Sequence, residues 1–159
     1  MRSHTLLTAP VAALFAAALA LGLPAVGQAE AVEGQEGQRI TVYKSPTCGC
    51  CQGWIDYLGS HGFAVETHDL ADLSAIKAQH GLGDPRLRSC HTAIVDGYVV
   101  EGHVPVDDIR RLLATAPPVL GITAPGMPQL SPGMLSTEPK DYDVLTFDAE
   151  GRTELFSRY

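Results

Sequence analysis

The sequence predicts a mixed α/β fold built around one domain. Short β-branched runs alternate with stretches of helical spacing between residues 39 and 116, and an Asp-Gly dipeptide separates the last two strand-like runs. The 159 residues are 45% hydrophobic and 18% charged, a balance that is typical of an ordinary globular domain and argues against a disordered or fibrous chain.

The first 38 residues are expected to lie outside this domain. Residues 1–29 have the layout of a secretory signal peptide, with an apolar run over 11–23 and small residues up to Ala29, so we expect cleavage after Ala29 and export. A retained membrane anchor is the alternative, because residues 6–23 carry no charge and approach the roughly 18 to 20 residues that a span needs. The polar residues 30–38 are interpreted as a flexible leader.

The domain is expected to begin with a strand and a helix. Residues 39–44 alternate β-branched and polar side chains, and the Ser-Pro pair that follows predicts a turn. From Trp54 to His61 the larger side chains keep the i, i+3, i+4, i+7 spacing of a helix, and Gly62 provides its end.

The same order is then repeated. Residues 63–70 are expected to form a strand, and residues 71–80 a helix that ends at Gly81. Two further strand-like runs, 92–95 and 98–104, lie on either side of the Asp-Gly dipeptide, which favours a tight hairpin turn.

A third helix is expected from Pro105, with two carboxylates in its first turn to complement the helix dipole. The order is therefore β-α-β-α-β-β-α. Strands joined by a helix lie parallel, whereas the hairpin adds an antiparallel strand. We expect residues 39–116 to form a mixed four-stranded sheet flanked by helices, which is the arrangement of a thioredoxin-like domain.

Residues 117–159 lack the alternating strand and helix patterns of residues 39–116. The Pro/Gly-rich stretch 117–134 is expected to be an irregular loop. Residues 142–147 and 153–156 resemble a C-terminal hairpin, which either pairs with a sheet edge or stands apart. We expect the loop and the hairpin to pack on the same domain.

The charge balance excludes one class of partner. The chain has 18 Asp and Glu against 11 Lys and Arg, a formal net charge of -7 at pH 7. Nucleic acids and anionic membrane surfaces bind basic patches, so we expect neither as a partner once the signal peptide is removed.

Three of the four cysteines fall within four residues, at the expected start of the first helix. A helix N-terminus stabilises thiolates, so Cys48, Cys50 and Cys51 are expected to be acidic. Cys48 and Cys51 have the spacing of a thiol-disulfide redox pair. The extra Cys50 invites mispairing in a disulfide catalyst, but it gives a soft metal another ligand.

The fourth cysteine, Cys90, precedes the third expected strand and should approach the other three from across the sheet. Four thiolates suit one tetrahedral zinc ion, yet the adjacent Cys50 and Cys51 point in different directions on a turning backbone. Sulfurs that bridge more than one copper(I) ion relieve this crowding. We therefore favour a small polynuclear copper-thiolate cluster over a zinc site.

Two histidines and two methionines are further candidates. His91 adjoins Cys90, and His103 follows the fourth expected strand on the same rim, so either could bind the metal or donate to a ligand. Met127 and Met134 offer thioether sulfur, which favours copper(I), although methionines in a wrapping loop more often fill gaps in the core.

Three segments in order carry a family resemblance: YKSPTCGCCQGWIDYL, SCHTAIVDGYVVEGHVP and the PGMP…SPGM stretch. Together they resemble the CopG-type periplasmic copper-resistance proteins, a metal-binding family catalogued as domain of unknown function 411, over about residues 40–134. The resemblance implies a thioredoxin-like fold and a role in bacterial copper export and detoxification. It also implies copper binding through four residues, Cys48, Cys50, Cys51 and Cys90.

The leading hypothesis is a periplasmic copper(I)-binding protein for copper resistance. It would sequester copper, transfer it to a copper chaperone or export system, or cycle it between copper(I) and copper(II), so enzymatic turnover stays open. The enzyme alternative is thiol-disulfide exchange by Cys48 and Cys51, and the third hypothesis is a structural zinc site.

Overall fold

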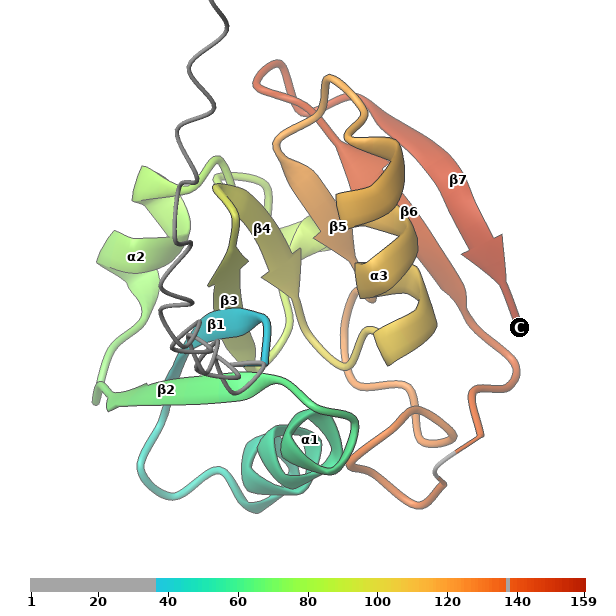
Figure 1. Cartoon of the computed structure of the whole chain (residues 1–159). Helices are drawn as coiled ribbons and strands as arrows, with labels where there is room; N and C mark the ends of the chain where they lie inside the picture. Colours follow the sequence, from blue (N-terminus) through green and yellow to red (C-terminus); the bar gives the residue numbers. More distant parts are fainter. Residues whose placement is uncertain (1–36, 137) are drawn as a thin grey trace, which may run out of the picture. The chain divides into compact units, whose positions relative to one another are not determined.

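A computed structural model describes residues 37–136 and 138–159 (Figure 1). The expected signal peptide and all but two residues of the expected leader lie outside these residues. No helix within the described part of the chain is long and apolar enough to cross a membrane. The elements in chain order are β1 (Arg39–Lys44), α1 (Gly49–Ser60), β2 (Ala64–Asp69), α2 (Ser74–Gln79), the short 3-10 helix η1 (Pro85–Leu87), β3 (His91–Val95), β4 (Tyr98–Glu101), α3 (Val106–Thr115), β5 (Gly121–Thr123), β6 (Asp143–Phe147) and β7 (Thr153–Arg158).

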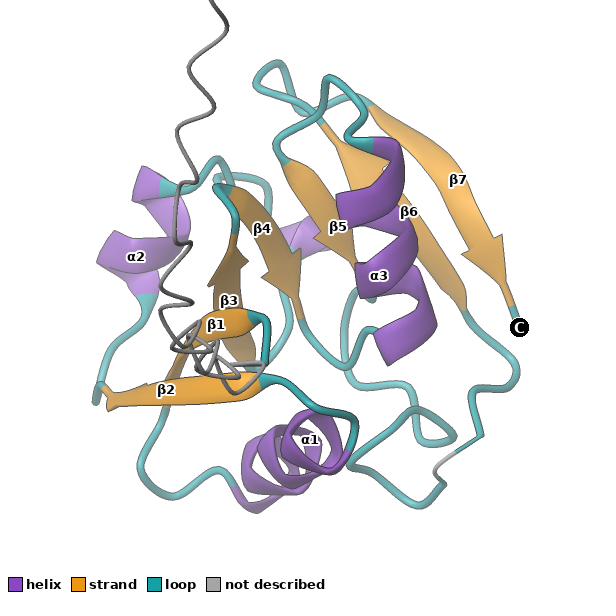
Figure 2. Ribbon diagram, viewed as in Figure 1, coloured by secondary structure: helices purple, strands orange, loops and turns teal. Residues whose placement is uncertain are grey.

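The predicted mixed α/β class is confirmed, and the strands form one sheet in the order β2-β1-β3-β4-β5-β6-β7 (Figure 2). β1 and β2 are parallel across the α1 connection, β3 is antiparallel to β1, and β4 is antiparallel to β3. The predicted four-stranded sheet is not confirmed, because β5, β6 and β7 extend it to seven strands.

The extension begins with a strand inside the Pro/Gly-rich stretch that was expected to be irregular. β5 is only three residues long and pairs parallel with β4. A Cβ at Gly121 would lie 2.0 Å from the Val99 carbonyl oxygen, so glycine is what lets β5 approach β4. The expected C-terminal hairpin is present as β6 and β7, and it pairs with the edge that β5 provides.

Helices cover both faces of the sheet. The larger core cluster joins α1 and α3 to one face, and α3 lies in front of β5 and β6 (Figure 2). Residues that alternate along β4 belong to different clusters: Val100 packs with α1 and α3, whereas Val99 packs with Leu82 and Leu87 on the other face. Trp54 of α1 is fully buried in the larger cluster, and its Nε1 donates to the Val104 carbonyl at 2.9 Å.

Candidate metal centre

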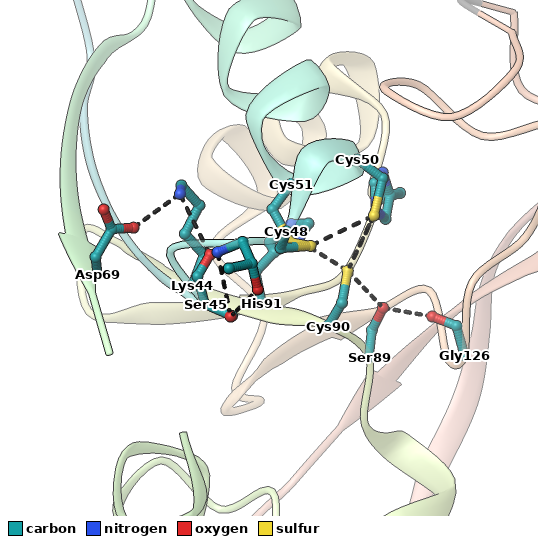
Figure 3. Close-up of a disulfide and its surroundings, with 12 residues drawn as sticks. Lys44, Ser45, Cys48, Cys50, Cys51, Asp69, Ser89, Cys90, His91 and Gly126 are labelled. Atoms are coloured by element: carbon teal, nitrogen blue, oxygen red, sulfur yellow. Dashed lines mark hydrogen bonds and ion pairs between the residues drawn. A yellow bond between two sulfur atoms is a disulfide. The ribbon is translucent and has the colours of Figure 1, made fainter. Parts of the chain in front are cut away.

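The cysteine motif lies where β1 passes into α1 (Figure 3). A turn closes first, with the Cys48 amide donating to the Ser45 carbonyl at 3.1 Å. Cys48 is the N-cap residue with an extended backbone, and the helix begins at Gly49. The start of α1 therefore brings Cys50 and Cys51 into its first turn, the end of the helix that carries positive partial charge.

The structure brings Cys90 to this motif. β1 and β3 are antiparallel, and the last residue of β1, Lys44, pairs with the first residue of β3, His91. Cys90 precedes His91, so it lies beside the loop that leaves β1. The Sγ atoms of four residues lie within 4.8 Å of one another: Cys48, Cys50, Cys51 and Cys90.

Two of these cysteines are joined. Cys48 and Cys51 form a disulfide, whereas Cys50 and Cys90 are free thiols. The Sγ of Cys50 lies 3.4 Å from that of Cys48 and 4.0 Å from that of Cys90 (Figure 3). The cluster is thus in an oxidised state, and four thiolates become available only after two electrons reduce the disulfide.

Burial controls the protonation of Cys90. It raises the pKa of the Cys90 thiol to about 11, and the neighbouring Cys50 adds to the shift because two thiolates repel each other. Cys90 is therefore a neutral thiol near pH 7, and a metal that binds its sulfur must displace the proton.

Two buried imidazoles face Cys90. Its Sγ lies 3.4 Å from His91 Nδ1 and 3.4 Å from His103 Nε2. Burial lowers the pKa of both histidines, and for His91 the neighbouring His103 and Lys77 lower it further. Both rings are therefore neutral near pH 7, which is the form that binds metals.

The end of the Pro/Gly-rich stretch 117–134, here called the C-terminal segment, orients one of these rings. His103 Nδ1 donates to the Pro132 carbonyl at 2.7 Å, which leaves the lone pair on Nε2, the nitrogen that faces Cys90. The segment packs flat on α1, since a Cβ at Gly53 would lie 2.7 Å from the Gly133 carbonyl oxygen. The other ring, His91, packs against Trp54 with ring centroids 4.4 Å apart and the ring planes tilted by 35°.

The two methionine candidates lie on the surface side of this segment. Met127 is 54% exposed. Met134 lines a groove along the outer side of α1, together with Tyr57 and Leu135. Their copper roles stay predictions.

Sequence reasoning missed a buried polar network beside the cluster. Lys77 of α2 forms an ion pair with Glu101 of β4, and both contact Thr92 of β3. Lys77 falls within the helix expected over residues 71–80, and Glu101 falls within the strand-like run 98–104. A charged residue inside the apolar run 98–104 was the signal that could have found the network.

The fold and the site define a class: a mixed α/β protein in which four cysteines and two neutral histidines converge on one partly buried point, a donor set that suits soft metals. Comparison with known proteins narrows the class. The family described as "Protein of unknown function, DUF411" matches residues 87–134. Two solved structures, titled "Copper resistance protein copG- Form 1" and "Form 2", are each 40% identical to the chain with a TM-score of 0.71.

Each match covers 78% of this chain, and 98% and 99% of the two solved chains respectively. No curated protein matches the chain. The chain therefore belongs to the CopG-type copper-resistance family.

Proposed function

We propose that this protein binds copper(I) through the four cysteines and that this binding contributes to copper resistance. One observation carries the proposal: the Sγ atoms of all four cysteines lie within 4.8 Å of one another, although Cys90 is 40 residues from Cys50. Metal–sulfur bonds are about 2.3 Å long, so sulfurs this close can share ions with small movements. The titles of the two CopG structures support copper as the metal.

Copper(I) suits this donor set better than zinc. Cys50 and Cys51 are adjacent on the first turn of α1, whereas structural zinc sites typically use cysteines separated by two to four residues. Sulfurs that bridge several copper(I) ions fit such crowding, and monovalent ions cancel thiolate charge one for one. His91 and His103 are proposed to bind copper or to donate to a ligand, because both rings contact Cys90.

The disulfide is the basis for a redox role. Reduction of the Cys48–Cys51 bond takes up two electrons and, with two protons, gives two thiols. Two copper(I) ions that each lose one electron would balance this step, with copper(II) as the product. Interconversion of copper(I) and copper(II) is thus one proposed use of the site, beside sequestration and transfer to a copper chaperone or export system.

The cellular location and the thioredoxin-like fold are also proposals. The signal-peptide layout of residues 1–29 supports export to the periplasm, which cell fractionation would test. The strand order β2-β1-β3-β4, with α1 following β1, supports a thioredoxin-like reading of residues 39–116.

The decisive experiment is a copper(I) titration. Fully reduced protein without residues 1–29, kept free of oxygen, competes with a chromophoric copper(I) chelator. We expect more than one tightly bound ion per chain and weaker binding after Cys50→Ser. His68→Gln, which removes an exposed imidazole on β2, is the matched control and should bind like wild type. Wild-type protein that fails to compete, or a Cys50→Ser variant that binds equally well, would refute the proposal.

A second function has one specific observation in its favour. The Cys48–Cys51 disulfide has the spacing that thiol-disulfide exchange requires. This alternative predicts reduction of insulin disulfides that survives Cys90→Ser and is lost in Cys51→Ser.

Metal analysis of protein purified without added copper distinguishes the structural zinc site from the copper proposal. The zinc site predicts stoichiometric zinc and unfolding when the zinc is chelated.

A further inference from the structure

We propose that Glu101, paired with Lys77, is the positioning residue that fixes Cys90 for metal binding. The inference rests on the proposed copper function. Glu101 touches neither a cysteine nor a proposed histidine ligand through its carboxylate. It acts instead through the residues on either side of the Cys90–His91 dipeptide.

The contacts of the carboxylate are fully assigned. Glu101 Oε1 accepts a hydrogen bond from Lys77 Nζ at 2.5 Å and from the Ser89 amide at 2.6 Å, and Oε2 accepts from the Thr92 hydroxyl at 2.7 Å. Lys77 Nζ also donates to Thr92 Oγ1 at 3.0 Å. Lys77 Nζ and the Ser89 amide can only donate, so Glu101 Oε1 accepts from both, and the Lys77 ammonium opposite favours the carboxylate form.

These contacts bracket the dipeptide. Ser89 precedes Cys90, and Thr92 follows His91, so the carboxylate holds the chain at both ends of the segment. The β3–β4 register places Thr92 opposite Glu101, and the Gly102 amide donates to the His91 carbonyl at 3.1 Å. The end of β4 therefore sets where Cys90 leaves the sheet.

The cost of burial points to a positional role. Glu101 is 0% exposed, and the Lys77 side chain is 8% exposed. Taking two charges out of water is costly, and a well-packed apolar pair would often be at least as stable. What an apolar pair cannot provide is directional bonds to the Ser89 amide and the Thr92 hydroxyl.

Small displacements of Cys90 matter because its sulfur has close neighbours on two sides. It lies 4.0 Å from Cys50 Sγ and 3.4 Å from the nearest nitrogen of each buried imidazole. Metal–sulfur bonds of about 2.3 Å tolerate little misplacement, and supporting residues of metal ligands commonly change affinity about 10- to 100-fold.

The test substitutes Glu101→Gln. Glutamine has the same shape but only one oxygen, so its amide NH₂ must face at least one of the three donors. We expect copper(I) affinity of the reduced protein to fall about tenfold or more. We also expect iodoacetamide to alkylate Cys90 faster relative to Cys50 in the reduced, metal-free protein, measured by peptide mass spectrometry.

Two further variants separate positioning from general destabilisation. Asp108→Asn is the matched control, because Asp108 is a buried carboxylate on α3 that accepts from Arg111, Ser157 and Tyr159, away from Cys90. It should leave copper affinity and the alkylation ratio unchanged. The pair Lys77→Met with Glu101→Leu leaves no unpaired charge, and it should fold while showing the same copper defect.

A double-mutant cycle closes the argument. In a Cys90→Ser background, Glu101→Gln should have little further effect on copper affinity, because the residue acts through Cys90. Equal affinity in wild type and Glu101→Gln would overturn the inference while leaving the copper function intact, as would an equal defect in Asp108→Asn. Wild-type protein that binds no copper would refute the proposed function instead, and the alkylation ratio would still decide whether Glu101 positions Cys90.

Discussion

Gly133 is the position where the contact between the C-terminal segment and α1 can be tested most sharply. Its φ is +82°, and a Cβ there would lie 2.4 Å from the Trp54 amide nitrogen and 2.7 Å from the Trp54 Cα. Both are backbone atoms of α1 at a fully buried residue, so they cannot rotate away as a side chain could. Gly133→Ala must therefore push the segment off α1, and the neighbouring Pro132 carbonyl would move away from His103.

The expected cost has two parts. An alanine in the left-handed region costs about 1–2 kcal/mol. Forcing a methyl group into a packed contact costs typically about 1–3 kcal/mol more. Gly133→Ala should therefore lower the free energy of unfolding by about 2–5 kcal/mol in total.

Gly151→Ala is the matched control. Gly151 has a φ of +75°, but a Cβ there would meet nothing within 4 Å. The free energy of unfolding of Gly151→Ala should fall only by the cost of the left-handed backbone conformation, about 1–2 kcal/mol. Urea unfolding of the metal-free proteins gives the difference, and copper(I) competition should show weaker binding in Gly133→Ala alone. Equal destabilisation of the two variants would show that the packing argument is wrong.

Two other predictions concern the rings around Cys90. Trp54→Phe removes the hydrogen bond to the buried Val104 carbonyl. Urea unfolding should show that the free energy of unfolding falls by about 1–3 kcal/mol, plus a smaller loss for the missing ring volume. A decrease below about 0.5 kcal/mol would contradict the assigned hydrogen bond. Burial lowers the pKa of His91 and His103, and the neighbouring His103 and Lys77 lower that of His91 further. As the pH falls below about 6.5, the unfolded chain therefore binds protons that the native chain does not. Stability of the metal-free protein should therefore decrease from pH 7.5 to 5.5, and His91→Gln should flatten this dependence; an unchanged slope would refute the assignment.

The sequence was most informative about local structure. The order of the first four strands and three helices follows from apolar spacing and turn residues within short windows, and each of these elements is present. The position of the cysteine motif at the start of α1 follows in the same way, from the Ser-Pro turn after β1. The sheet extension did not follow, because three residues of β5 among prolines and glycines carry no recognisable period.

The site shows the same division. The amino-acid order alone indicates which residue types could bind a soft metal, that three of them share one helical turn, and that Cys90 should approach them from across the sheet. Three-dimensional packing was needed to show that the Cys50 and Cys90 sulfurs lie 4.0 Å apart, that Pro132 orients His103 across 29 residues, and that Glu101 pairs with Lys77 across 24. Helix and turn signals reach only about three or four residues along the chain, whereas these contacts depend on strand pairing and on packing between segments far apart in sequence.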